Sequence, residues 1–185
     1  MRGLRITGGD LRGRAIPTPS HSHRPTSSKA RQAFFNMIAP QIRGARFLDL
    51  FAGSGAFALE AASRGAEFAL AVDTERRAMV TLAELASRWA VPVHTLCMDA
   101  LKAVRTLGEK NEPFGVVYAD PPYDYPHYQE LLQSIDRDLP LEADAVIGME
   151  HRRKENWVEE RELNRIRVRK TSLYGEVAIT TFEVA

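Results

Sequence analysis

Residues 47–55 read FLDLFAGSG, an apolar run that leads into two glycines one residue apart. Residues 47–50 predict a short buried strand, and Gly53 and Gly55 predict a tight turn into a helix over residues 56–64. The free N–H groups at the start of such a helix add a favourable dipole for ligand binding. A glycine loop of this kind also occurs as a plain strand-to-helix turn, so it does not define a ligand by itself.

The alternation of strand and helix continues after this loop. Further strands are predicted at residues 68–73, 92–96, 114–119 and 145–149, and further helices at residues 75–90, 99–107 and 127–139. Residues 165–170 and 177–184 then predict a hairpin around Tyr174-Gly175. This order indicates a doubly wound, mostly parallel α/β sheet of seven strands, Rossmann-like, with an antiparallel C-terminal hairpin.

The N-terminal residues have a different pattern. Residues 4–6 and 14–16 predict a small β-hairpin, residues 17–26 a linker rich in Pro and Ser, and a helix follows from Thr26 or Ser27 to about Pro40. We therefore expect a basic N-terminal extension at residues 1–44 and the main domain at residues 45–185.

Charge is divided between these two parts. The chain has 25 basic and 24 acidic residues, a net charge of +1. Residues 1–46 hold nine of the basic residues and one acid, a net charge of +8, which leaves a net charge of −7 on the other 139 residues. Such asymmetry suggests that the N-terminal part binds a polyanion, although a solvated arginine-rich surface would have the same composition.

Length and composition exclude several classes. A chain of 185 residues with 44% hydrophobic residues is expected to form one domain with its own core. The single cysteine permits no internal disulfide and no zinc cluster, and no apolar run is long enough to span a membrane. We expect a reduced, cytoplasmic, monomeric protein without a metal site.

Three acids, Asp49, Asp73 and Asp99, stand at the ends of predicted strands. The carboxyl ends of parallel strands meet at one edge of a sheet, where ligands bind. A carboxylate at the end of the second strand can accept both hydroxyls of a ribose. Asp73 and Asp99 could instead be helix N-terminal carboxylates, which are common.

The most specific motif is Asp120-Pro121-Pro122-Tyr123, at the end of the fourth predicted strand. Two prolines stiffen the backbone, so the Asp120 carboxylate and the carbonyl that follows it form a fixed pair of acceptors. An exocyclic –NH₂ group has two donors for such a pair, and Tyr123 can stack on the ring that carries it. The motif predicts a site for an aromatic amine.

With these motifs in place, the chain resembles the class I S-adenosylmethionine-dependent methyltransferases that methylate amino groups. Within them it is most similar to the small subunit methyltransferase D family, the bacterial 16S ribosomal RNA guanine-N2 methyltransferases. The likeness extends over nearly the whole chain. It includes RITGG at residues 5–9, RGR at 12–14, RPT at 24–26, DLFAGSG at 49–55, SRGA at 63–66 and DPPY at 120–123.

The resemblance implies S-adenosyl-L-methionine as the cofactor and a role for each matching residue. The implied cofactor-binding residues are Asp49, Phe51, Ala52, Gly53, Ser54, Gly55, Asp73, Asp99 and Ala100. The residues implied to hold the target base are Asp120, Pro121, Pro122 and Tyr123. The basic residues expected to bind RNA phosphates are Arg5, Arg12, Arg14, Arg24, Lys29 and Arg31.

The expected reaction is methyl transfer to N2 of guanine 966 of 16S rRNA, in a 30S subunit or an assembly intermediate. Two alternatives remain on the same fold: an adenine-N6 methyltransferase of DNA or RNA, and a non-catalytic RNA-binding assembly protein. A nicotinamide-dependent oxidoreductase could use the glycine loop, but it leaves Asp-Pro-Pro-Tyr without a role.

Overall fold

The computed structural model describes residues 4–17, 28–153 and 163–185. Its centre is one seven-stranded sheet in the order β3-β2-β1-β4-β5-β7-β6. The strands are β1 (Arg46–Leu50), β2 (Phe68–Asp73), β3 (Val93–Cys97), β4 (Phe114–Ala119), β5 (Leu141–Arg152), β6 (Ile166–Tyr174) and β7 (Val177–Val184). Strands β1 to β5 pair in parallel, and β7 runs antiparallel to both β5 and β6. The predicted fold class is confirmed.

Two strands are longer than the sequence pattern predicts. Strand β5 begins at Leu141 and reaches Arg152, whereas alternation alone indicated residues 145–149. Its last residues are held by the antiparallel pairing with β7, in which Arg152 lies opposite Val177. Strand β6 likewise extends to Tyr174 because it pairs with β7 as far as Val177.

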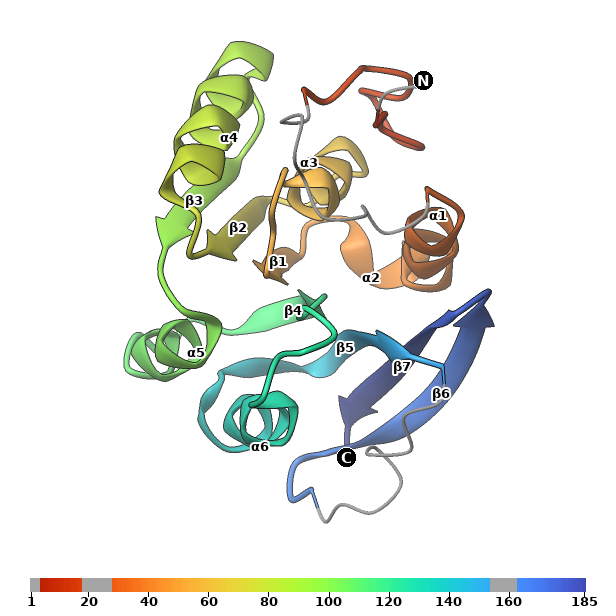
Figure 1. The fold of residues 1–185 in the computed structure, drawn as a ribbon, viewed down its shortest axis with the longest axis vertical. Helices are drawn as coiled ribbons and strands as arrows, with labels where there is room; N and C mark the ends of the chain where they lie inside the picture. Colours follow the sequence, from red (N-terminus) through yellow and green to blue (C-terminus); the bar gives the residue numbers. More distant parts are fainter. Residues whose placement is uncertain (1–3, 18–27, 154–162) are drawn as a thin grey trace.

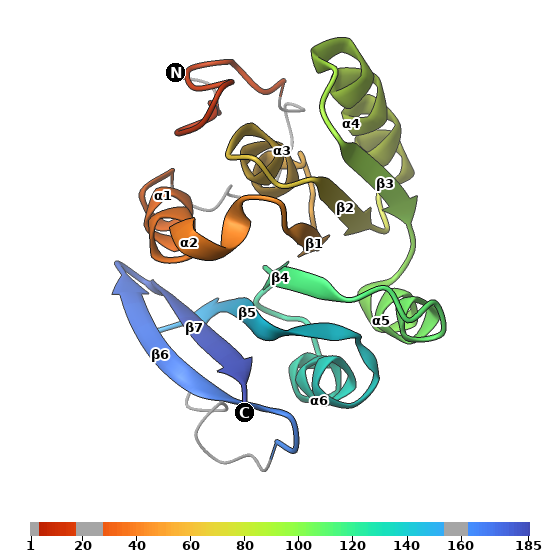
Figure 2. The ribbon, with the colours of Figure 1, turned by 180° about the vertical axis from the view of Figure 1, so that it is seen from behind.

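Six helices in the described residues cover the two faces of the sheet. They are α1 (Ser28–Met37), α2 (Ala39–Ile42), α3 (Ala56–Ser63), α4 (Arg76–Trp89), α5 (Ala100–Gly108) and α6 (Tyr128–Asp138). Helices α1 to α4 lie on one face and α5 and α6 on the other (Figure 1), as the view from behind also shows (Figure 2). The four-residue α2 was not predicted, because Pro40 was expected to end α1; proline fits the first turn of a new helix.

Side-chain alternation along β1 divides the core into two layers. Phe47 belongs to the cluster under α1 to α4, while Leu48 and Leu50 belong to the cluster under α5 and α6. No helix in the described part of the chain is long and apolar enough to cross a membrane.

The described N-terminal residues pack into the same core. Arg5 and Ala15 form a β-bridge, and Ile6 N donates to the Arg14 carbonyl at 3.0 Å, so the predicted hairpin forms, but only as a short pairing. Ile6 and Ile16 are buried in the cluster that also contains Phe34 of α1. Packing is therefore continuous across residue 44, and the division of the chain there stays a prediction about function.

A buried carboxylate, Glu60 of α3, joins the hairpin to the sheet domain. Thr7 donates to Glu60 through its backbone N at 2.8 Å and its hydroxyl at 2.6 Å. Arg64 Nε donates to Glu60 Oε1 at 2.9 Å, and Arg31 Nε lies 3.5 Å from Oε2. Arg31 also donates to the Arg5 carbonyl at 2.6 Å. We call Thr7, Arg31, Glu60 and Arg64 the Glu60 cluster.

Burial in the Glu60 cluster contradicts one predicted role. The Arg31 side chain is only 1% exposed, so its guanidinium does not reach a phosphate at the surface. Desolvation lowers the pKa of Arg31, and the charge of Glu60 opposes this shift. Arg31 therefore fixes the hairpin to α3, and its expected contact with RNA is wrong.

The turn of the hairpin rests on the last residue of α3. Asp10 N donates to the Ser63 carbonyl at 2.8 Å, and Leu11 N donates to the Ser63 hydroxyl at 2.9 Å. A Cβ at Gly9 would lie 1.8 Å from the Ser63 carbonyl oxygen, so only glycine fits at this contact. The turn is thus held at the end of α3 that is remote from the glycine loop.

Loss of the charge in the Glu60 cluster is expected to destabilise the protein. The change Glu60→Gln keeps the shape of the side chain but leaves Arg31 buried without its counter-ion. Breaking a buried pair costs about 3–5 kcal/mol. At about 2–4 °C for each kcal/mol in a chain of this size, Tm falls by roughly 6–20 °C in thermal unfolding followed by circular dichroism.

The matched control is Glu130→Gln, which removes the partner of Arg105 from an exposed pair. Exposed pairs contribute up to about 1 kcal/mol, so this change is expected to shift Tm by only a few degrees. Equal shifts for the two variants would contradict the role of the Glu60 cluster.

Candidate active site

The glycine loop, residues 51–55, connects β1 to α3 through an unusual backbone. Phe51, Gly53 and Gly55 all have positive φ, at 66°, 52° and 74°. A Cβ at Gly55 would also lie 2.4 Å from the Leu82 side chain of α4. A Cβ at Gly53 would meet nothing within 4 Å, so the surface above this residue is open to a ligand.

Asp73, the last residue of β2, holds this loop in place. Its Oδ2 accepts from Gly53 N at 2.8 Å, and its Oδ1 accepts from Glu75 N at 2.9 Å. Glu75, not Asp73, caps α4, because its side chain accepts from Arg77 N. Each oxygen of Asp73 keeps a further lone pair for a ligand hydroxyl.

Asp49 lies in β1 and is buried under the first turn of α3. Its Oδ2 accepts from Ala58 N at 3.0 Å, which satisfies one of the free donors of that helix, since the N-cap Gly55 has no side chain. Burial raises the pKa of Asp49 well above its usual range, and the bond from Ala58 opposes this. The charges of Asp120 and Asp73 raise it further.

Asp99 is exposed and caps α5. Its carboxylate accepts from Lys102 N at 3.1 Å, which is the helix-capping role that the sequence also allowed. Ala100, the next residue, is buried in the cluster under α5 and α6. Asp99 lies close enough to Tyr125 to help raise the pKa of its phenol to about 12, although burial is the larger cause. A contact of Asp99 and Ala100 with the cofactor stays a prediction.

The Asp-Pro-Pro-Tyr segment follows β4 directly. Asp120 N donates to the Leu50 carbonyl at 3.3 Å, which places this segment beside the start of the glycine loop. The Pro121 carbonyl accepts from the Tyr128 hydroxyl at 3.0 Å. A carbonyl oxygen has two lone pairs, so it can accept a second donor. Tyr123 is 42% exposed.

Aromatic residues after this segment connect it to the glycine loop, and sequence reasoning missed them. The ring of Tyr125 lies 5.0 Å from Phe51 and 6.0 Å from Tyr128. Tyr125 N donates to the Pro122 carbonyl at 2.8 Å. Three tyrosines within the six residues 123–128, the first of which belongs to the motif, are the signal that could have indicated an aromatic wall.

Another buried acid, Glu150 of β5, lies on the face of the sheet that α1 to α4 cover. Its Oε2 accepts from the Tyr118 hydroxyl at 2.8 Å, and the ring of Tyr118 stacks on Phe57 at 3.8 Å. Burial raises the pKa of Tyr118 well above 10, and the charges of Glu150, Asp120 and Asp49 add to this. Tyr118 therefore stays protonated and donates to Glu150.

The expected RNA-binding residues differ in their exposure to solvent. Arg5, Arg12, Arg14 and Lys29 are exposed. Arg5 Nη1 donates to the Gly13 carbonyl at 2.8 Å, and the guanidinium of Arg14 lies 5.4 Å from the ring centre of Trp89. Arg31 is buried, as described above, and Arg24 lies outside the described residues, together with residues 18–26 of the predicted linker.

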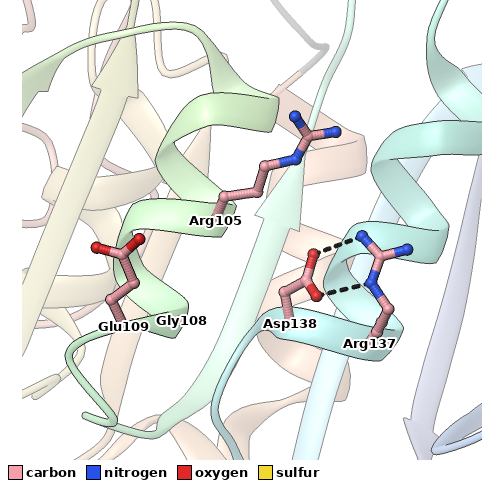
Figure 3. A pocket seen from close by; sticks show the side chains of 5 residues that line it. All are labelled: Arg105, Gly108, Glu109, Arg137 and Asp138. Carbon is pink, nitrogen blue, oxygen red and sulfur yellow. Dashed lines mark hydrogen bonds and ion pairs between the residues drawn. The ribbon is translucent and has the colours of Figure 1, made fainter.

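A shallow pocket between α5 and α6 lies away from these residues (Figure 3). It is lined by Arg105, Gly108, Glu109, Arg137 and Asp138, and Arg137 donates to Asp138 at 2.7 Å. Both helices end here, at the edge where β4 and β5 begin, whereas the acids described above lie at the opposite edge. Among the described residues, no group of three His, Cys, Asp or Glu side chains could hold a metal ion.

Known proteins have sequences that are similar to this chain over most of its length. The Bacillus subtilis protein YlbH is 35% identical over 154 residues, 82% of this chain and 84% of that protein. The Escherichia coli protein named ribosomal RNA small subunit methyltransferase D is 36% identical over 149 residues, 80% of this chain and 74% of that protein.

Solved structures agree with the fold. The Escherichia coli protein yhhF superposes with a TM-score of 0.86 at 27% identity, over 98% of this chain and 97% of that chain. A protein from Thermus thermophilus superposes with a TM-score of 0.81 at 30% identity, over 98% and 99% of the two chains. The family model described as Conserved hypothetical protein 95 matches residues 4–183. Because this match covers almost its full length, the chain belongs to the Conserved hypothetical protein 95 family.

Proposed function

We propose that this protein transfers the methyl group of S-adenosyl-L-methionine to the exocyclic N2 of a guanine in 16S ribosomal RNA. The observation that carries the proposal is the position of Asp120 and the Pro121 carbonyl, two acceptors beside the glycine loop. The name of the Escherichia coli relative supports ribosomal RNA of the small subunit as the substrate. Guanine 966 is the position that the family resemblance favours.

The residues around the glycine loop fit a cationic cofactor. Asp49 is buried, and neighbouring negative charges raise its pKa, so a positive group there would relieve an unfavourable environment. The open surface above Gly53 leaves room for the backbone of an amino acid, and Asp73 offers acceptors for ribose hydroxyls. When bound, S-adenosylmethionine supplies a methyl group on a positively charged sulfur, already activated for transfer.

The task of the protein is to prepare the amine. The lone pair of guanine N2 is delocalised into the ring, which makes N2 a poor nucleophile. Asp120 and the Pro121 carbonyl accept hydrogen bonds from the two N–H groups of this amine. These bonds orient the amine and favour a pyramidal nitrogen. Alignment of the two reactants supplies much of the acceleration in such a reaction.

Charge and protons balance in this step. The N–C bond forms as the S–C bond breaks, and the methylated amine carries a positive charge until it releases one proton. Asp120 stabilises that charge and accepts the proton or passes it to water. A paired or stacked base cannot reach these acceptors, so the target nucleotide must be turned out of its stack.

The hairpin and the start of α1 supply contacts to the rest of the RNA. Arg5, Arg12 and Arg14 of the hairpin and Lys29 of α1 are exposed and bind phosphates without reading sequence. The Glu60 cluster fixes the hairpin to the domain, so these contacts set the position of the RNA on the enzyme. A small subunit or an assembly intermediate is the substrate that we propose, with residues 1–44 as the RNA-contacting part.

Replacement of Asp120 tests the proposed chemistry. We expect Asp120→Ala to reduce kcat at least about 10²–10³-fold, because one of the two acceptors that orient and stabilise the amine is lost. Affinity for S-adenosylmethionine is expected to change little. Transfer of labelled methyl groups to unmodified 16S rRNA measures the first quantity, and isothermal titration measures the second.

The matched control for this change is Asp124→Ala, which removes an exposed carboxylate four residues further along the same segment. It is expected to leave kcat within about twofold. Substantial activity in Asp120→Ala would contradict the proposed role of Asp120. A wild-type protein that binds S-adenosylmethionine but methylates no RNA would contradict the proposed function itself.

The raised pKa of Asp49 gives a prediction about stability. The folded chain holds the Asp49 proton more tightly than the unfolded chain, so stability is lost as pH rises through the folded pKa. Asp49→Asn removes this cost, and its side-chain oxygen can still accept from Ala58 N. We expect a higher Tm than that of the wild type at pH 8, by about 2–4 °C for each kcal/mol gained.

The same change is expected to weaken cofactor binding at least about tenfold, because it removes the carboxylate that we propose to bind the amine of the cofactor. The gain in Tm should shrink as pH falls, since acid protonates Asp49 in the wild type. Thermal unfolding at pH 8 and pH 5 and titration with S-adenosylmethionine measure the two effects. A lower Tm at pH 8, or unchanged affinity, would show that Asp49 is not a destabilised binding group.

A further inference from the structure

The exposed arginines of the hairpin lie near the edge of the sheet that is opposite the carboxyl ends of the parallel strands. They are therefore too far from the Asp-Pro-Pro-Tyr segment to hold the target nucleotide. The turn of the hairpin rests on Ser63, the last residue of α3, and Arg14 packs on Trp89, the last residue of α4. Both helices start at the carboxyl edge of the sheet and end at the other edge. The eight residues of α3 span about 12 Å between the glycine loop and the hairpin.

The carboxyl edge itself is acidic. Asp49, Asp73, Asp99 and Asp120 stand there, and the charges of Asp73 and Asp120 reach Asp49. A nucleotide that enters this edge brings a phosphate on each side of its sugar. Like charges repel, so the approach of RNA requires a cationic group close to the Asp-Pro-Pro-Tyr segment.

Arg152, at the end of β5, is a cation in this position. Strand β5 is the neighbour of β4, with Met149 paired to Ala119, so Arg152 extends past the strand end beside residues 120–123. Its guanidinium carbon lies 4.8 Å from the ring centre of Tyr123. Arg152 is exposed, and no ion pair joins it to a carboxylate within the described ranges of the chain.

The backbone around Arg152 is held on both sides. Arg152 pairs with Val177 of β7, and Arg153 N donates to the Glu176 carbonyl at 3.0 Å. The buried side chain of His151 bonds to the Thr180 hydroxyl at 2.8 Å through Nε2 and to the Arg152 carbonyl at 2.9 Å through Nδ1. The direction of the Arg152 side chain is thus set by a fixed strand end and by the ring of Tyr123.

We propose that Arg152 binds the RNA phosphate next to the target nucleotide, with its guanidinium placed by the ring of Tyr123. A guanidinium that lies over an aromatic ring keeps its N–H edge for bidentate bonds to phosphate oxygens. The target base then meets Asp120 and Pro121 while its own phosphate is neutralised. The assignment rests on the proposed function, and it adds a second RNA contact, separate from the hairpin.

Three variants of Arg152 separate charge from geometry. Arg152→Ala is expected to make the dependence of RNA affinity on salt less steep by about 0.7–0.9 in the log–log slope, the value of one phosphate contact. Arg152→Lys keeps the charge, so its slope should match that of the wild type, while kcat/KM for RNA recovers only in part because the planar, bidentate contact is lost. Arg152→Glu should lower kcat/KM for RNA about tenfold or more.

The control is Lys110→Glu, which makes the same change in net charge in an exposed turn just before β4, at the opposite edge of the sheet. RNA affinity is measured by fluorescence anisotropy on an unmodified 16S rRNA fragment, and KM for S-adenosylmethionine in the same preparations should be unchanged. Arg152→Ala with the wild-type salt slope, or Arg152→Glu no worse than Lys110→Glu, would overturn the assignment.

Failure of the proposed function has a different signature. If the wild type binds the RNA but transfers no methyl group to it, the methyltransferase proposal fails, and the salt slopes still decide whether Arg152 contacts a phosphate. If the wild type transfers methyl groups and the Arg152 variants bind and react as it does, only the Arg152 assignment fails.

Discussion

Negative charge concentrated at one edge of the sheet is the constraint around which this molecule is organised. Parallel strands β1, β2 and β4 bring Asp49, Asp73 and Asp120 together, and burial with mutual repulsion raises the pKa of Asp49. The N-terminus of α3 offsets part of this cost through Ala58 N. A bound cation would offset the rest, which is why a sulfonium cofactor with a free amine suits this edge better than a neutral or anionic one.

The same charge repels RNA, and we propose that basic residues in two places offset this repulsion. The hairpin carries exposed arginines and is locked to α3 through the Glu60 cluster, at a distance from the acids. We assign the nearby contact to Arg152, beside Tyr123. The net charge of +1 therefore conceals an uneven distribution: residues 1–46 carry a net charge of +8, and the other 139 residues, which include the proposed cofactor and base sites, carry −7.

Features that depend on neighbouring residues in the sequence were predicted well. The strand and helix alternation, the glycine loop and the position of the Asp-Pro-Pro-Tyr segment after β4 follow from local patterns, and the structure contains them. Features that depend on distant partners were not predicted. Arg31 was expected to be exposed like the other arginines of the N-terminal part. Its buried partner Glu60 lies 29 residues further along the chain, so no local pattern indicated the pair. Tyr128, which donates to the Pro121 carbonyl, was also missed, although it lies only seven residues from Pro121, because the spacing of the tyrosines does not show which backbone oxygen each hydroxyl reaches.

The identity of the methylated atom tests the proposed function most directly. The protein is incubated with unmodified 16S rRNA, free and in small subunits, and with S-adenosylmethionine that carries a deuterated methyl group. The RNA is then digested to nucleosides and analysed by mass spectrometry. For a guanine-N2 methyltransferase we expect the deuterated methyl group in N2-methylguanosine; its appearance in N6-methyladenosine instead, or in no nucleoside, would contradict the proposed function.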